Sequence, residues 1–308
     1  MAMALLKSAS LLLLTLATGL AQAQTWHHER GTITLEQPPQ RVVALNWAAT
    51  EALLLLDITP VGAADKDYYR VWVQEPELPD SVANVGTRSS PSLAAISELQ
   101  PDLIVTSGQL APAYEQLQRI APTYVISVYD EGVVPSEQAT TMLKTLGQMF
   151  NRESRAEAVL AGISAKLAAN RERLAAAGLT DKPVAIVNFM DDRHVRVYAP
   201  NGLLQAGLEG LGLSNAWTSD GNFWGFSLVG LEALAPLGDA RLVAISPTPP
   251  GLSEQLSRSP FWTHLPMVRN REVYQINPVW TFGGVHSISR LADELTDQLL
   301  QGGGSNVR

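Results

Sequence analysis

The chain has 308 residues, no cysteine and a formal net charge of −8, from 22 Lys and Arg against 30 Asp and Glu. Without a run of basic residues, this acidic balance disfavours a nucleic-acid partner, because binding to phosphates needs a basic surface. The lack of cysteine excludes disulfides and a lipid-anchored cysteine, so the fold must depend on its hydrophobic core, for which the chain is long enough.

The first 23 residues have the order of a secretory signal peptide. Lys7 carries their single positive charge, an apolar run covers residues 11–14, and Ala21-Gln22-Ala23 forms a small-x-small cleavage site. The apolar run is too short for a membrane span. A retained amphipathic anchor is the alternative. We expect the mature chain to begin at Gln24 and to be free in the periplasm of a Gram-negative bacterium.

Short strand patterns alternate with helical patterns from residue 41 onward. Strands that alternate with helices at this spacing favour a parallel sheet, and they predict an N-terminal α/β lobe over residues 24–150. The strands are expected at 41–46, 61–65, 102–108 and 123–128, and the helices at 50–58, 92–100 and 114–122, with Thr50 as the cap of the first helix.

A long helical region follows at residues 136–177, rich in Ala, Leu, Arg and Glu. Ala158, Leu160 and Ile163 recur at helical spacing, so one side of this helix is expected to pack against the rest of the protein. Gly178 fits a C-terminal stop. We therefore predict a single long rigid helix at residues 151–178 that joins two lobes.

The alternation of strands and helices resumes after Gly178. Residues 231–246 repeat the order of residues 93–107: a short amphipathic helix, a Pro or Gly break, an Asp, and a buried strand that ends in Ser. The repeat predicts a C-terminal α/β lobe over residues 179–308, although two unrelated α/β units can share such an order by chance. The expected architecture is two Rossmann-like α/β lobes with a ligand cleft between them. In this half, strands are expected at 183–190, 240–246 and 272–277, and helices at 202–213, 228–238, 252–262 and 287–300.

The sequence contains no recognisable catalytic or nucleotide-binding motif. No P-loop Lys-Ser/Thr pair is present, the glycines of residues 207–213 fall inside a helical pattern, and there is neither a Gly-x-Ser-x-Gly turn nor a cysteine nucleophile. The five histidines lack the i, i+3 or i, i+4 spacing of a helical metal site. We therefore expect a protein that is not an enzyme and that does not ligate a metal with its own side chains.

Aromatic residues are concentrated in three expected loops. Such side chains can fasten a loop to the core, but three aromatic loops from both halves of the chain are better explained by a shared cleft. Arg88 lies near the N-terminal end of the helix expected from Leu93, where it either serves that cleft or is a solvated turn residue. The loops contain Tyr68, Tyr69 and Trp72, then Phe223, Trp224 and Phe226, and finally Trp280 and Phe282.

Four segments carry a resemblance to a known family: RVVALNW (41–47), ADKDYYRVWVQEPELPDSVANVGTR (64–88), NAWTSDGNFWG (215–225) and NPVWTFGG (277–284). They resemble the periplasmic ferric-hydroxamate siderophore-binding proteins of bacterial ABC importers, with similar order and spacing over nearly all of the mature chain. The resemblance implies two α/β lobes, one stiffening helix between them, and a shallow cleft that closes little when ligand binds.

The resemblance also implies a set of ligand-binding residues. Arg88 matches the arginine that hydrogen-bonds the hydroxamate oxygens around iron, and Trp72 matches an aromatic residue on the first lobe's side of the cleft. Trp224 and Trp280 match tryptophans on the second lobe's side, and Phe282 lies where the family can have Tyr.

One position departs from the family pattern. Leu110 stands where family members carry a Tyr that also bonds the hydroxamate, and Tyr114 follows four residues later. Either Tyr114 reaches into the cleft or that bond is lost. Phe223 and Tyr69, which neighbour the matched aromatics, complete the expected ligand-binding set.

The implied function is delivery of a ferric siderophore to an inner-membrane ABC permease by a monomeric protein. A siderophore fills all six iron positions, so no cofactor is expected, and a nearly neutral ferric trihydroxamate needs only one cation. Glu232 and Glu98 are the expected permease-docking residues, one on each lobe. The alternatives are cobalamin, haem or another siderophore class bound by the same fold, and, outside this class, an exported hydrolase or reductase.

Overall fold

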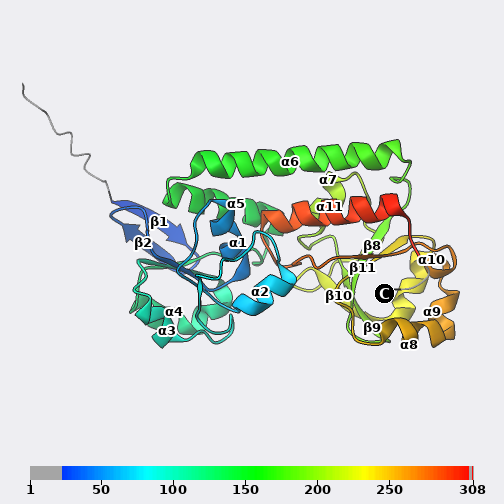
Figure 1. Cartoon of the computed structure of the whole chain (residues 1–308), viewed down its shortest axis with the longest axis horizontal. Coiled ribbons are helices and arrows are strands. Elements are labelled where there is room, and N and C mark those ends of the chain that lie inside the picture. The colour runs from blue at the N-terminus through cyan, green and yellow to red at the C-terminus, as the bar shows by residue number, and fades with distance from the viewer. Residues whose placement is uncertain (1–22, 305–306, 308) are drawn as a thin grey trace, which may run out of the picture.

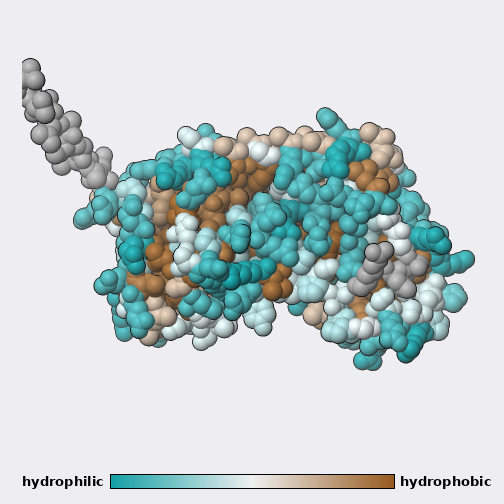
Figure 2. All heavy atoms as spheres, viewed as in Figure 1, coloured by the Kyte–Doolittle hydropathy of each residue, from teal (hydrophilic) through white to brown (hydrophobic). Residues whose placement is uncertain are grey.

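The computed structural model describes residues 23–304 and 307, so the expected signal peptide lies outside the described residues except for Ala23. Two five-stranded sheets form the centres of two lobes that lie side by side along the long axis of the molecule (Figure 1). The surface is indented between the lobes at the lower edge of the same view (Figure 2). The predicted two-lobed α/β class is confirmed, whereas the lobe limits at residues 150 and 179 stay a prediction.

The N-terminal lobe is built on a parallel sheet in the order β5-β4-β3-β6-β7. Helices cover both faces, and the central strands are therefore buried and apolar except for Thr106. An antiparallel hairpin that the sequence did not indicate, β1 (Gln24–His28) and β2 (Gly31–Leu35), packs beside β7. The sheet comprises β3 (Val42–Ala44), β4 (Gly62–Ala63), β5 (Ala83–Asn84), β6 (Leu103–Thr106) and β7 (Thr123–Val125).

The first helix, α1 (Trp47–Leu55), begins earlier than expected. Asn46 is its cap, because the Asn46 Oδ1 accepts a hydrogen bond of 2.8 Å from the backbone N of Ala49. The prediction of Thr50 as the cap is wrong: Thr50 lies inside the helix and donates its hydroxyl to the Asn46 carbonyl. The lobe's other helices are α2 (Lys66–Trp72), α3 (Leu93–Glu98), the 3₁₀ helix η1 (Gly108–Ala113), α4 (Tyr114–Gln118) and α5 (Pro135–Met149).

The predicted helical region at 136–177 consists of two helices, α5 and α6 (Glu153–Ala176). The chain turns between them at Asn151, whose φ of 53° lies in the left-handed region and ends the first helix. The second helix runs along the top of both lobes in Figure 1 and packs against α5 and the C-terminal helix α11 (Val285–Gln301). A connecting helix of this length stiffens the join between the lobes.

The C-terminal lobe has a mixed sheet in the order β10-β9-β8-β11-β12. Strands β8 (Val184–Phe189), β11 (Arg241–Ile245) and β12 (Val273–Ile276) are parallel, whereas β9 (His194–Tyr198) and β10 (Phe226–Gly230) are added antiparallel at one edge. The remaining helices are α7 (Gln205–Gly210), the 3₁₀ helix η2 (Leu231–Leu237), α8 (Leu252–Arg258), α9 (Pro260–His264) and α10 (Pro266–Arg269).

The helix predicted at 228–238 is wrong. Its first three residues belong to β10, which pairs with the unpredicted strand β9. Only the residues that follow are helical, and they form the 3₁₀ helix η2. Pairing with β9 satisfies the backbone hydrogen bonds of β10, and Pro236 prevents η2 from continuing as an α-helix. The internal repeat is nevertheless real in the structure, because α3 precedes β6 as η2 precedes β11.

A buried carboxylate joins the two lobes. Glu51, on α1, accepts hydrogen bonds from the backbone N of Gly284 (3.3 Å), the backbone N of His286 (2.8 Å) and the Ser287 hydroxyl (3.2 Å). It thereby caps the N-terminus of α11, where the helix dipole favours an acceptor. A Cβ at Gly284 would stand 2.6 Å from a Glu51 oxygen, so this close approach requires glycine.

The Glu51 link makes stability depend on pH. Burial raises the pKa of Glu51 from 4.5 to about 7, against its three hydrogen bonds, so the folded state binds the proton more tightly than the unfolded chain. The resulting stability is complete below pH 4.5 and is lost as pH rises through 7. Relative to Glu51→Gln, the wild type is expected to lose about 2 kcal/mol of unfolding free energy between pH 5 and pH 7.

Urea unfolding of both proteins at pH 5, 6 and 7 measures this difference, and the comparison removes the contributions of every other titrating group. If the unfolding free energies of the wild type and Glu51→Gln changed with pH in parallel, the proposed titration of Glu51 would be contradicted.

Candidate ligand-binding site

A cavity of about 370 Å³ opens between the two lobes. Its walls come from segments that follow the carboxyl ends of parallel strands: residues 46–47 after β3, 107–109 after β6, 126–130 after β7, and 280–282 after β12. Open α/β sheets place ligands at this edge, because the strand-to-helix loops converge there. Three further segments complete the walls: Glu29 from the turn between β1 and β2, Arg88 after β5, and residues 223–224 before β10.

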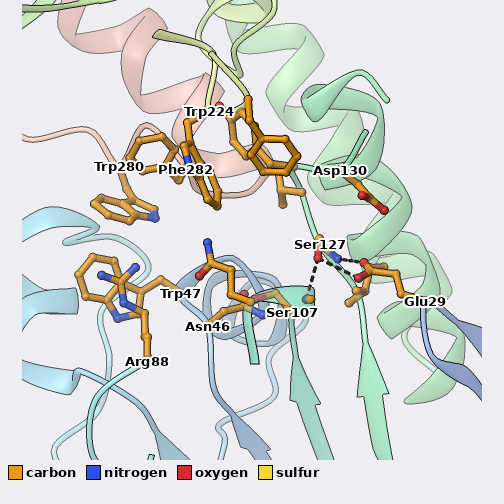
Figure 3. Close-up of a pocket in the computed structure, with 16 residues that line it drawn as sticks. Glu29, Asn46, Trp47, Arg88, Ser107, Ser127, Asp130, Trp224, Trp280 and Phe282 are labelled. Atoms are coloured by element: carbon orange, nitrogen blue, oxygen red, sulfur yellow. Dashed lines mark hydrogen bonds between the residues drawn. The ribbon is translucent and has the colours of Figure 1, made fainter. Parts of the chain in front are cut away.

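One wall of the cavity is aromatic and comes from the C-terminal lobe. The Phe282 ring lies 5.2 Å from that of Trp280 and 5.7 Å from that of Trp224. Tyr129 and Trp47, from the other lobe, continue this cluster, with Trp47 4.5 Å from Trp280. The rings meet in tilted and edge-to-face pairs, so they hold one another in place while leaving apolar faces toward the cavity (Figure 3).

Arg88 faces this aromatic wall. Its guanidinium carbon lies 3.5 Å from the centre of the Trp47 ring and 5.0 Å from that of Trp280. The Nε and the backbone N of Arg88 both donate to Asp65 Oδ2 at 3.0 Å, which fixes the guanidinium plane. The two terminal nitrogens have no partner among the described residues, and the side chain stays 33% exposed. They are therefore free to donate to a ligand oxygen.

The pKa of Arg88 is lowered by burial, while the hydrogen bond and the charge of Asp65 act in the opposite direction. An arginine stays protonated under such a shift, because its ordinary pKa is far above physiological pH. The site therefore presents the Arg88 guanidinium as a fixed cation, with its two terminal nitrogens as a pair of parallel hydrogen-bond donors.

The structure brings five of the expected ligand-binding residues together at the cavity. They come from both lobes and surround one space, as the sequence predicted for a shared cleft. These residues are Arg88, Phe223, Trp224, Trp280 and Phe282.

Three expected residues do not line the cavity. Trp72 packs behind Trp280 at 6.3 Å, where it supports the wall. Tyr69 is fully buried, with its ring against Trp47 and its hydroxyl donating to the Pro76 carbonyl, so it belongs to the core. The expectation that these two form cavity walls is corrected by their packing.

Tyr114 also lies away from the cavity. Its ring packs 5.9 Å from that of His28 on the hairpin, and its hydroxyl accepts a hydrogen bond of 2.7 Å from Gln118 Nε2. Leu110, at the position of the family Tyr, is buried and does not line the cavity. Tyr114 therefore does not replace the missing hydroxyl.

Sequence reasoning missed several residues of the cavity. Asn46 ends the first predicted strand and Trp47 follows it, and the carboxyl end of a parallel strand was an available signal for both. Asn46 Nδ2 is buried and has no hydrogen-bond partner among the described residues, so the floor of the site has a donor to offer. Tyr129 and Asp130 follow β7 in the same way, whereas Glu29 had no such signal because its hairpin was not predicted.

The cleft continues outward past Arg88 into a second hollow of about 420 Å³. It shares Arg88 and the aromatic wall with the first cavity and adds Asp65 and Arg196. The Arg196 guanidinium lies 4.9 Å from the centre of the Phe226 ring and makes no ion pair among the described residues. A ligand larger than either hollow can therefore span both.

Within residues 23–304 and 307, no group of three or more His, Cys, Asp or Glu side chains is arranged to hold a metal ion. No helix in this part of the chain is long and apolar enough to cross a membrane.

Comparison with known proteins assigns the fold to a family. Residues 42–279 match the family model described as periplasmic binding protein. The chain belongs to the periplasmic binding protein family. Among curated members, the iron(3+)-hydroxamate-binding protein FhuD of Escherichia coli is 34% identical over 249 residues, 81% of this chain and 83% of that protein. The Fe(3+) dicitrate-binding periplasmic protein FecB of Escherichia coli is 27% identical, over 88% of this chain and 89% of that protein.

Solved structures of this periplasmic binding protein family agree with the fold. The Fe3+–Desferal-bound siderophore-binding protein FhuD from Vibrio cholerae superimposes with a TM-score of 0.81 at 32% identity, over 85% of this chain and 98% of that one. The catecholate-siderophore-binding protein VctP from Vibrio cholerae gives a TM-score of 0.68 at 19% identity, over 90% of this chain and 100% of that one, and at that identity it shows the fold alone. The resemblance seen in the sequence is thereby confirmed.

Proposed function

We propose that this chain is a periplasmic, non-enzymatic binding protein that captures ferric hydroxamate siderophores and delivers them to an inner-membrane ABC transporter. The observation that carries the proposal is Arg88, held by Asp65 and Trp47 with its two terminal nitrogens free, opposite an aromatic wall from the other lobe. The names of the relatives from Escherichia coli and Vibrio cholerae support the same ligand class.

The chemistry of a siderophore complex suits such a cleft. The siderophore supplies six oxygen ligands to its iron, so the protein has only to recognise the outer surface of the complex. Hydroxamate oxygens accept hydrogen bonds from the free guanidinium nitrogens of Arg88, and the apolar linkers between hydroxamates pack against Trp224, Trp280 and Phe282. Asn46 Nδ2 is positioned at the cavity floor to supply a further donor.

The balance of charge in the cleft favours a hydroxamate over a catecholate. Three hydroxamates cancel the charge of Fe³⁺, whereas three catecholates leave a net charge of −3. Two guanidiniums and three carboxylates line the cleft: Arg88 and Arg196, against Asp65, Glu29 and Asp130. A triply anionic complex would meet net repulsion in this cleft, while a neutral complex would not.

Tryptophan fluorescence of the mature protein tests the proposal, because Trp47, Trp224 and Trp280 line the cavity. The panel is ferric ferrichrome, ferrioxamine, aerobactin and enterobactin, with cobalamin and haem, corrected for absorbance by the ligands and repeated by calorimetry. Saturable micromolar or tighter binding of a hydroxamate, without binding of enterobactin, is expected. Binding confined to cobalamin, haem or enterobactin would overturn the ligand class while leaving the fold unchanged.

Delivery to a permease requires exposed contact residues on both lobes, and we propose Glu98 and Glu232 for this role. Glu98 is the last residue of α3 and Glu232 is the second residue of η2, and both are exposed at corresponding units of the internal repeat. The variant Glu98→Arg/Glu232→Arg is expected to keep its ligand affinity within twofold and to lose at least tenfold in affinity for the permease. Glu157→Arg on α6 is the control for a charge reversal elsewhere. Unchanged permease affinity in the double variant would remove both residues from the docking surface.

A further inference from the structure

The charges around the cavity are separated into two groups. Arg88, with Arg196 beyond it, lies at one end, and Glu29 and Asp130 lie at the other. Figure 3 shows Glu29 and Asp130 across the cavity from Arg88, with the aromatic rings above the space between them. The proposed contacts to the iron complex use the Arg88 end and the aromatic wall, so the acidic end has no assigned role.

The Glu29 carboxylate is held in a fixed position by the N-terminal lobe. The backbone N and the hydroxyl of Ser127 both donate to it, the hydroxyl at 3.0 Å, although the two residues are 98 positions apart in the chain. The Ser127 hydroxyl in turn accepts a hydrogen bond of 3.0 Å from the backbone N of Gly108, and the backbone N of Glu29 donates to the Val125 carbonyl at 3.2 Å. These contacts hold the hairpin against the N-terminal lobe and place the Glu29 carboxylate at the cavity.

Neither carboxylate of the acidic end is neutralised by the protein. No Lys, Arg or His among the described residues forms an ion pair with Glu29 or Asp130. Burial raises the pKa of Glu29, and the negative charge of Asp130 raises it further, while Ser127 and the neighbouring Arg30 act in the opposite direction. Two carboxylates that repel each other at the edge of a ligand cavity are both stabilised when a cation enters between them.

We propose that Glu29 and Asp130 form a subsite for a primary ammonium at the end of a linear trihydroxamate siderophore. The inference rests on the proposed function and narrows its ligand class. The neutral iron centre binds at Arg88, the methylene linkers follow the aromatic wall, and the terminal ammonium reaches the two carboxylates. An alkyl ammonium has an ordinary pKa near 10.4 and is charged in the periplasm. Its three donors match carboxylates, and because Glu29 and Asp130 are both exposed residues at the cavity a flexible tail can reach them.

The experiment compares ferrioxamine B, a linear ferric trihydroxamate with a terminal ammonium, with its N-acetyl derivative, which has the same iron centre and a neutral end. Calorimetry on the wild type is expected to show three- to tenfold tighter binding of ferrioxamine B in 20 mM salt. The preference should shrink in 500 mM salt, because exposed charge pairs are screened.

Three variants test whether the preference for ferrioxamine B over its N-acetyl derivative depends on Glu29 and Asp130. Asp130→Asn, which leaves the Ser127 contacts of Glu29 intact, should reduce the preference, and Glu29→Gln/Asp130→Asn should abolish it without weakening the acetylated ligand. Glu131→Gln, an equal change of charge on the next residue, which does not line the cavity, should preserve it. Equal affinity of the wild type for both ligands, or a preference that persists in the double variant, would overturn the subsite alone. Failure of both ligands to bind the wild type would instead overturn the proposed function.

Discussion

Arg88→Ala is expected to weaken the binding of a ferric trihydroxamate by about 1.5–3 kcal/mol, a loss of roughly 10- to 150-fold in affinity. The guanidinium is already held by Asp65 at 3.0 Å and by the Trp47 ring at 3.5 Å, so it contributes its two free nitrogens with little loss of side-chain entropy on binding. Calorimetric titration of the purified variant measures the change.

The control variant is Arg88→Lys, which keeps a positive charge but lacks the planar pair of donors. It should recover only part of the affinity, because a point charge does not reproduce two parallel hydrogen bonds. Thermal unfolding of both variants checks that the Asp65 carboxylate, left without its partner in Arg88→Ala, has not unfolded the lobe. An Arg88→Ala protein that is folded and binds with wild-type affinity would remove Arg88 from the site.

Trp280→Ala is expected to cost roughly 2–3 kcal/mol of binding free energy. Its ring contacts Trp47, Phe282 and the Arg88 guanidinium at 4.5, 5.2 and 5.0 Å, so truncation removes apolar surface from the wall and one support of the cation together. Trp224→Ala should lower affinity less, because Trp224 has no cation–π contact with Arg88 among the described residues.

The matched control is Trp26→Ala, because Trp26 lies on the hairpin outside the cavity and should leave affinity unchanged. Ligand titration and a thermal melt are both run on each tryptophan variant. A large fall in melting temperature for both Trp224→Ala and Trp280→Ala, with binding unchanged in the folded fraction, would make these residues core packing and not ligand contacts.

The sequence was sufficient for the two-lobed fold because its strands are short apolar runs bounded by helices, a local signal that tertiary contacts did not override. It was insufficient where pairing alone decides the structure. Strands β9 and β10 pair antiparallel although 27 residues, including helix α7, separate them, and no periodicity within β10 distinguishes it from the helical turn that follows. The turn at Asn151, which divides α5 from α6, likewise depends on one left-handed residue in an otherwise helical pattern.

The candidate site was predictable in composition but not in orientation. Tyr68 and Tyr69 are adjacent on α2, yet Tyr68 is 63% exposed and Tyr69 is fully buried, because the rotation of a helix and not its sequence position decides which ring faces solvent. Glu29 reaches the cavity through its contacts with Val125 and with Ser127, which is 98 residues away. Such long-range contacts carry no local sequence signal, whereas Arg88 and the aromatic loops around Trp224 and Trp280 did. The first aromatic segment, expected as a loop, is helix α2 and lies outside the cavity lining.

The cleft is proposed to recognise the outer surface of an intact hydroxamate complex whose iron centre is neutral. Calorimetry with ferric ferrichrome, its substitution-inert Cr³⁺ analogue and ferric enterobactin tests this recognition. We expect the ferric and chromic trihydroxamates to bind one-to-one with equal affinity, micromolar or tighter, and enterobactin not to bind. Tight binding of enterobactin with none of either trihydroxamate, or binding of the ferric complex alone, would contradict the claim.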